Sequence, residues 1–97
     1  MGMCKPSGGI KEETGRLGSL DRMGEPNSRI DLYNKNGELI QRRWYGADGW
    51  VVWNRDYKHP DTTKTLKFPH DHKWAFDDRN GRPERGEDHL EVNLDFC

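Results

Sequence analysis

The sequence predicts a small, mainly β protein, α+β at most, built on an antiparallel sheet of four to five strands. Short runs rich in β-branched and aromatic residues recur along the chain, and turn-forming segments separate them. Of the 97 residues, 31% are hydrophobic and 34% charged, so the apolar core must be thin. Four Trp, three Tyr and three Phe therefore have to do much of the packing.

Residues 1–28 are rich in Gly, Ser and charge, and their apolar residues are too sparse to define a helix. We expect a leader or linker, short or disordered, with at most one short helix, followed by a single domain over 29–97. The leader lacks the apolar centre of a signal peptide, and no stretch approaches the roughly 20 apolar residues of a membrane span. Cys4 and Cys97 lie at opposite ends, so we expect reduced thiols rather than a disulfide framework.

Three strands in a hairpin meander are expected next, in SRIDLYN (28–34), ELIQRRWY (38–45) and WVVWNRDY (50–57), with turns at KNG and GADG. For the first hairpin we favour the register that pairs Leu32 with Ile40. This register gathers four apolar side chains on one face, namely Ile30, Leu32, Ile40 and Trp44. A shift of one residue would split that set. Arg43 and Tyr45 are then expected on the opposite face.

A fourth strand is expected in TLKFPHDHKWAF (65–76), where alternation puts His70, His72 and Trp74 on one face. Pro69 cannot donate a ladder hydrogen bond, which favours an edge position or a bulge. After a turn-rich segment, HLEVNLDF (89–96) alternates between apolar and polar residues. This segment carries the clearest strand signal in the chain.

Charge is distributed unevenly along the chain, although the net charge is only −1. Residues 29–75 carry nine Lys or Arg against six Asp or Glu, whereas residues 76–97 carry three against seven. Basic residues mixed with aromatics suit a nucleic-acid surface, because cations neutralise phosphate and aromatic rings stack on bases. A solvated sheet face with ordinary charges explains the same distribution equally well.

The paired histidines of FPHDHKW (68–74) are compatible with two chemistries or with a structural role. A metal site would need further ligands besides His70 and His72, and Asp56, His59 or His89 could supply them. Cleavage of RNA by transesterification needs a base for the 2′-hydroxyl, an acid for the leaving 5′-oxygen and cations beside the phosphorane. Histidines can fill both proton-transfer roles near neutral pH. We favour RNA cleavage, which requires no metal and no cofactor.

A family resemblance supports this choice. PNSRIDLYNKNGELIQRRWYGADG, followed by RDYKH and FPHDHKW, resembles the small C-terminal ribonuclease domains of bacterial polymorphic toxins, in particular the class called polymorphic toxin type 24. The resemblance extends from about Glu25 to Asp78. It implies an RNA-cleaving toxin of bacterial competition that a cognate immunity protein neutralises. Such domains normally end a long chain, so we expect secretion or delivery as part of a larger toxin that acts in the target-cell cytoplasm.

The chemistry of RNA cleavage and the resemblance together suggest the site residues. The expected catalytic residues are His70 and His72 as acid and base, Arg43 as phosphate ligand, and Tyr45 and Asp56 in support. The expected RNA-binding residues are Arg42, Tyr57, His59, Lys67, Lys73 and Trp74. We expect no membrane association and no stable DNA complex. The alternative is a non-enzymatic module that binds nucleic acid or protein through a basic aromatic sheet face.

Overall fold

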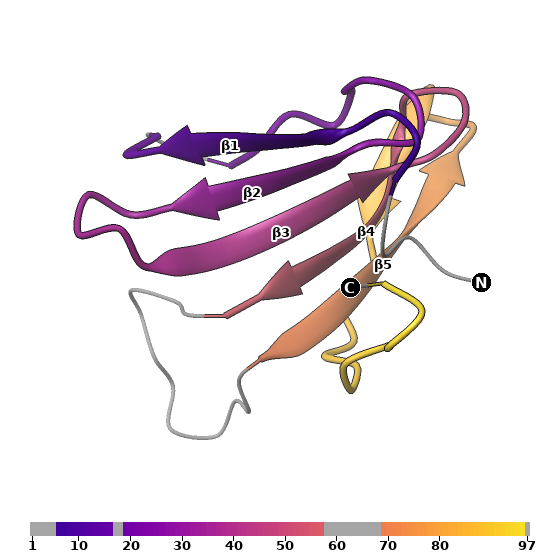
Figure 1. Ribbon diagram of the computed structural model, residues 1–97. Helices are drawn as coiled ribbons and strands as arrows, with labels where there is room; N and C mark the ends of the chain where they lie inside the picture. Colours follow the sequence, from indigo (N-terminus) through magenta and orange to yellow (C-terminus); the bar gives the residue numbers. More distant parts are fainter. Residues whose placement is uncertain (1–5, 17–18, 58–68, 97) are drawn as a thin grey trace.

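The computed structural model describes residues 6–16, 19–57 and 69–96. Six strands form one sheet, and their order across the sheet follows their order in the chain (Figure 1). The strands are β1 (Ile10–Thr14), β2 (Arg29–Tyr33), β3 (Leu39–Tyr45), β4 (Val51–Asp56), β5 (His70–Asp77) and β6 (Arg82–Arg85). No helix occurs in the described ranges, and so none that could cross a membrane. The mainly β fold is confirmed, with slightly more strands than expected.

Strand β1 lies in the segment for which we expected a leader with at most one short helix. It pairs with β2 in parallel, with Ile10 opposite Arg29, whereas all other neighbouring strands are antiparallel. The sheet is therefore mixed. Parallel pairing requires the chain to cross over the sheet between the two strands. This crossover brings Leu20 into the core, where it is 3% exposed.

The register of the β2–β3 hairpin differs by one residue from the expected one. Leu32 lies opposite Gln41, and Ile30 lies opposite Arg43. An irregularity in the pairing between residues 32 and 33 absorbs the shift, and Ile40 still packs against the core. Arg43 therefore shares a face with Ile30 and Leu32, which corrects our expectation.

The observed register is favoured by contacts on the other face of the sheet. Asp31 lies opposite Arg42, and Arg42 Nε is 3.1 Å from Asp31 Oδ1. Trp44 turns to this same face, where it is fully buried and meets the ring of Phe96 edge-on with centroids 5.3 Å apart. The expected register was wrong because it assumed that Trp44 is buried on the same face as Ile30 and Leu32. Both faces of the sheet are covered, so an apolar residue can be buried on either one.

Each face of the sheet has its own character, and we name the two faces accordingly. The histidine face carries Ile30, Leu32, Gln41, Arg43, Asn54, Asp56, His70, His72 and Trp74. The arginine–aspartate face carries Arg29, Asp31, Arg42, Trp44, Trp53, Arg55 and Asp71. The small apolar core comprises Leu20, Ile30, Leu32, Tyr45 and Val51.

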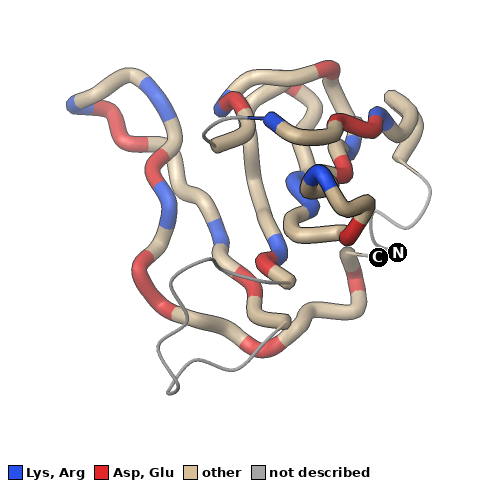
Figure 2. Tube along the Cα trace, turned by 90° about the vertical axis from the view of Figure 1, so that its left-hand side faces the viewer, with Lys and Arg blue, Asp and Glu red and all other residues tan. Residues whose placement is uncertain are grey.

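Ion pairs hold the three arginines of the arginine–aspartate face. Arg29 donates two hydrogen bonds to Asp31, at 2.7 and 2.9 Å, and Arg55 donates two to Asp71, at 2.8 and 3.1 Å. Bidentate pairing of this kind allows a guanidinium to be buried. Figure 2 shows basic and acidic residues interleaved along the trace of the chain. The excess of basic residues in the middle of the sequence thus contributes to internal pairs.

Strand β5 pairs with β4 on one side and β6 on the other. The expected edge position for this strand is therefore wrong, and the paired residues show no register shift near Pro69. Pro69 instead directly precedes the first strand residue, His70, where its missing N–H removes no ladder hydrogen bond. Strand β6 arises within the segment that we had assigned to turns.

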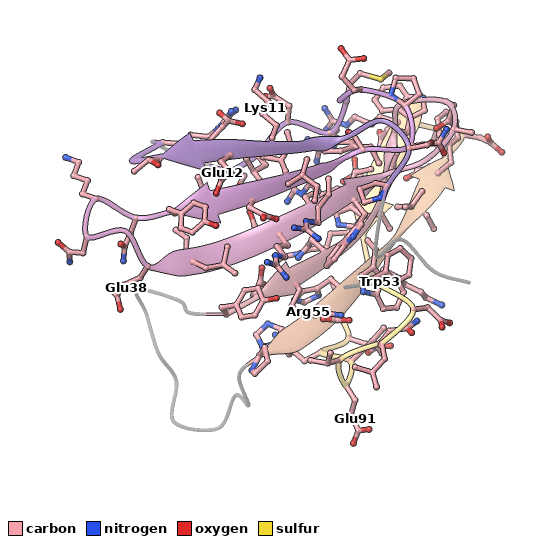
Figure 3. All side chains as sticks on the ribbon, viewed as in Figure 1. Lys11, Glu12, Glu38, Trp53, Arg55 and Glu91 are labelled. Carbon is pink, nitrogen blue, oxygen red and sulfur yellow. The ribbon has the colours of Figure 1, made fainter. Side chains whose placement is uncertain are left out.

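The segment 89–96, for which we expected a strand, forms only a single bridge, between Leu90 and Asp71. Beyond the bridge, the Asn93 N–H donates to Asp71 Oδ2 at 2.8 Å, and Phe96 stacks on Trp53 with centroids 4.9 Å apart. We call this segment the C-terminal strap. Figure 3 shows Trp53 and Arg55 on the sheet beside the strap, and Glu91 pointing away from it. Asp71 accepts side-chain and backbone donors that an ordinary strand would not present, so the alternation in the sequence was misleading.

Candidate active site

The site is built on the register between β4 and β5. The segment NRD (54–56) lies antiparallel to HDH (70–72), with Asn54 opposite His72 and Asp56 opposite His70. Because side chains alternate along a strand, the middle residues of the two segments meet on one face and the outer residues on the other. Two polar layers result, an ion pair on the arginine–aspartate face and a histidine–carboxylate group on the histidine face.

A third histidine joins this group from the C-terminal strap. Leu90 forms a bridge with Asp71, so the preceding residue, His89, is directed to the histidine face. Its ring centroid lies 4.7 Å from that of His70 and 5.0 Å from that of His72, and the latter two lie 5.1 Å apart. His70 and His72 are buried, whereas His89 is exposed. We call His70, His72, His89 and Asp56 the histidine cluster, which meets solvent at His89.

The carboxylate of Asp56 is oriented by two amide side chains. Its Oδ1 accepts hydrogen bonds from Gln41 Nε2 at 2.8 Å and from Asn54 Nδ2 at 3.2 Å. Its Oδ2 lies 3.3 Å from His70 Nε2 and 3.5 Å from His72 Nε2. The amide of Asn54 is itself held, because Asn54 Oδ1 accepts a hydrogen bond from the indole of Trp74. The other carboxylate oxygen thus faces the two imidazoles.

The imidazole of His72 has a defined orientation. Its Nδ1 lies 3.0 Å from the carbonyl oxygen of Gly86, and this oxygen can only accept, so Nδ1 carries the proton. Nε2 is buried and makes no hydrogen bond within the described residues. Burial lowers the pKa of His72, because removing the ring from water disfavours its charged form. The neutral ring then presents the lone pair of Nε2 to the cluster.

A polar cavity of about 410 Å³ adjoins the cluster, with three arginines and two glutamates in its lining, and Arg22 is paired with Glu84 at 3.2 Å. It is lined by Ser19, Leu20, Arg22, Arg43, Trp74, Glu84, Arg85 and Glu87. The guanidinium carbons of Arg43 and Arg22 lie 4.8 and 5.6 Å from the centre of the Trp74 ring. Arg85 is exposed and directly precedes Gly86, whose carbonyl holds His72. The cavity thus combines cations with an aromatic ring next to the imidazoles.

Arg43 and Tyr45 occupy the histidine face, but their polar groups are engaged elsewhere. Arg43 is 3% exposed, its Nη1 donates to the carbonyl oxygens of Leu20 and Asp21, and burial lowers its pKa. Tyr45 is fully buried, and its hydroxyl donates to the Asp21 carbonyl oxygen at 2.7 Å. Burial raises the pKa of Tyr45 to about 12. Both side chains anchor the crossover segment to the sheet.

Several of the expected RNA-binding residues lie away from the cluster. Arg42 contacts Asp31 and lies 5.9 Å from the centre of the Tyr57 ring, on the arginine–aspartate face. Lys73 is exposed and pairs with Trp53 in the ladder, on that same face. Among the expected RNA-binding residues that the structure describes, only Trp74 lines the cavity. The expected residues His59 and Lys67, and both cysteines, lie outside the described residues.

The sequence reasoning missed the residues that organise the cluster. Gln41 and Asn54 orient Asp56, and Gly86 orients His72 through its backbone. His89 had been considered only as a metal ligand. A signal for Asn54 was present, because NRD and HDH both place polar residues at alternate positions of neighbouring strands.

Comparisons of the chain with protein-family models, with curated proteins and with solved structures find no match. Fold and site define a small mixed-sheet protein with a histidine–carboxylate cluster that is buried except at His89 and lies beside a polar cavity.

Proposed function

We propose that this protein is a ribonuclease that cleaves RNA by general acid–base catalysis at the histidine cluster. The observation that carries the proposal is a group of three neighbouring imidazoles, two of which face one oriented carboxylate, next to a cavity whose lining includes three arginines and Trp74. Transesterification takes its nucleophile, the 2′-hydroxyl, from the RNA. The protein therefore needs only proton transfer and stabilisation of the charge on the phosphorane.

Burial changes the roles that we assign to the histidines. The rings lie about 5 Å from one another, too close to hold a phosphate between them, so the phosphate must approach from the exposed side. His89 is the ring on that side and contacts the phosphate in this proposal. The Nε2 of His72 is an acceptor but is buried, so in this proposal His89 takes the proton of the 2′-hydroxyl and returns it to the leaving 5′-oxygen, while His72 supports the His89 ring from inside the cluster. Asp56 Oδ2 lies 3.3 Å from His70 Nε2 and helps to hold that ring in place.

The adjacent cavity supplies the RNA-binding surface in this proposal. Arg85 is exposed, and its planar guanidinium suits a phosphate next to the scissile one. The edge of Trp74 offers a contact for a base. The role as a toxin and the cognate immunity protein rest on the family resemblance. An inhibitor that covers His89 and Arg85 would block both the cluster and the cavity.

The test is incubation of the purified chain with total RNA, followed by separation of the products by length. The proposal expects shortened RNA from the wild type and from Glu91→Ala, an exposed change on the strap, and intact RNA from His89→Ala. RNA that is retarded but not shortened would instead support the binding module.

A strong chelator separates proton transfer from metal chemistry. Because the nucleophile belongs to the substrate, we expect cleavage to continue in EDTA. The measurement is the initial rate of RNA cleavage with and without EDTA. A magnesium-dependent nuclease, which EDTA should inactivate, is the control for effective chelation. Loss of cleavage that zinc restores would contradict acid–base catalysis by free imidazoles.

A further inference from the structure

We propose that His70, His72, His89 and Asp56 bind a zinc ion or a similar divalent transition-metal ion. This inference concerns the same residues as the proposed ribonuclease site, but it stands on the geometry of the cluster alone. A bound metal ion would occupy the lone pairs that proton transfer uses, so only the metal-free protein would cleave RNA in the proposed way. Metal binding is predicted whether or not that metal-free form is a ribonuclease.

The separations within the cluster suit a tetrahedral ion. One ring nitrogen from each histidine lies within 4.8 Å of those of the other two. With metal–ligand bonds of about 2.0–2.1 Å, neighbouring ligands of a tetrahedral zinc ion lie about 3.4 Å apart. Asp56 Oδ2 is already 3.3 and 3.5 Å from the Nε2 atoms of His70 and His72. Closing the set requires the longest nitrogen separation, up to 4.8 Å, to shorten by about 1.4 Å, and His89 is the exposed ring of the three.

The surroundings of two ligands match those of bound metal ions. Histidine ligands usually donate their second N–H to a backbone carbonyl or carboxylate, and this bond directs the other nitrogen to the metal. His72 has this arrangement, with Nδ1 bonded to Gly86 and Nε2 buried and without a hydrogen bond in the described part of the chain. Asp56 is likewise held through Oδ1 by Gln41 and Asn54. Both ligand atoms are therefore preoriented.

The local charges also favour a cation at this point. The lone pair of His72 Nε2 faces the carboxylate oxygen of Asp56 at 3.5 Å, an arrangement that repels unless a positive charge lies between them. Three imidazoles and one carboxylate form a ligand set of borderline softness. Such a set prefers zinc and its neighbours over magnesium or calcium, which bind oxygen ligands.

Binding is tested by titrating the full chain with Zn²⁺ and with Co²⁺, without RNA. Cys4 and Cys97 are both replaced by serine, so that no thiol contributes. We expect one Zn²⁺ per chain by calorimetry and the intense visible absorption of tetrahedral Co²⁺. His89→Ala should weaken Zn²⁺ binding by at least about 10- to 100-fold, as even indirect changes at metal sites do. The matched control Glu91→Ala should bind as tightly as the parent.

Two results would overturn the metal site, namely the absence of saturable Zn²⁺ binding, or equal affinity in the parent and His89→Ala. Because His89 is exposed, its replacement leaves the fold intact, and the melting temperature without metal verifies this. Zn²⁺ should raise the melting temperature of the parent and of Glu91→Ala but not of His89→Ala, since binding stabilises only the state that holds the site. Intact RNA in the cleavage assay together with saturable Zn²⁺ binding would refute the ribonuclease and retain the metal site.

Discussion

Burial decides what a single substitution can reveal at the histidine cluster. His72 is 1% exposed and hydrogen-bonded to the backbone of Gly86. Its removal leaves a cavity and an unpaired carbonyl, and we expect a loss of about 1 to 3 kcal/mol in the free energy of unfolding. A loss of activity in His72→Ala would therefore combine chemistry with stability.

His89→Ala is the sharper test of catalysis. The side chain is exposed, so the free energy of unfolding should change by less than about 0.5 kcal/mol. If His89 transfers a proton to or from the RNA, the cleavage rate should fall about 10² to 10⁴-fold. Urea denaturation and initial rates are measured on the same preparation. A rate within twofold of the wild type would exclude His89 from proton transfer.

The buried hydroxyl of Tyr45 should make the protein less stable at alkaline pH. Its pKa is raised to about 12 in the fold because burial disfavours the phenolate, whereas in the unfolded chain it is about 10. The neutral form is thus favoured by folding. The contribution of Tyr45 is complete below pH 10 and is lost as the pH rises towards 12, by up to about 3 kcal/mol.

The measurement is the free energy of unfolding in urea between pH 9 and 11.5, for the wild type and Tyr45→Phe. Phenylalanine keeps the ring but cannot ionise, so the difference between the two proteins should shrink as the pH rises. A difference that is constant with pH would show that Tyr45 does not titrate abnormally.

The C-terminal strap shows how one buried side chain can position a whole element. Asp71 is fully buried and accepts hydrogen bonds from Arg55, from the Trp53 indole at 2.7 Å and from the backbone of Asn93. Its own backbone forms the bridge to Leu90. These contacts attach the strap to the sheet and thereby place His89 beside His72. The cluster therefore depends on a residue that points to the opposite face.

Asp71→Ala should detach the strap. It leaves the guanidinium of Arg55 buried without its carboxylate, which typically costs about 3 to 5 kcal/mol in the free energy of unfolding. Asp95→Asn, an exposed change on the strap, should cost less than about 0.5 kcal/mol. Urea denaturation measures both, and tryptophan fluorescence reports the loss of stacking between Phe96 and Trp53. Similar stability of the two variants would show that the strap is held by other contacts.

At the scale of the whole molecule, the first 28 residues contribute to the sheet and the core. Strand β1 pairs along β2, and Leu20 packs against Ile30, Leu32, Tyr45 and Val51. The backbone of residues 20 and 21 also accepts hydrogen bonds from Arg43 and Tyr45. A core of this size leaves little stability in reserve.

Truncation tests this contribution. A chain of residues 29–97 loses the cover of its core and the acceptors for two buried side chains, so we expect it to unfold without a cooperative transition. Ile10→Ala in β1, where the side chain is 50% exposed, should melt close to the wild type. Circular dichroism against temperature measures both. A cooperative transition in the truncated chain would show that residues 29–97 fold alone.

The strands β2, β3 and β4, and the shared face of His70, His72 and Trp74, followed from the sequence. The sequence patterns that predict these strands are local, because alternation and turn propensity depend only on residues that are close together along the chain. The register of β2 and β3 did not follow, because a single irregularity reverses which side chains share a face. The structure of the strap did not follow from the sequence either. Its alternation implied a strand, whereas hydrogen bonds to residues distant in the sequence hold it as an irregular segment with a single bridge.

The candidate site shows the same division. The pairing of NRD with HDH lay within reach of the sequence, because both segments alternate and neighbouring strands pair. Three other features depend on contacts between residues 14 to 19 positions apart. They are the approach of His89, the orientation of Asp56 by Gln41 and the anchoring of His72 by Gly86. Such contacts are set by the crossover, the bridge at Leu90 and the burial of both faces, which exist only once the sheet has closed around its core.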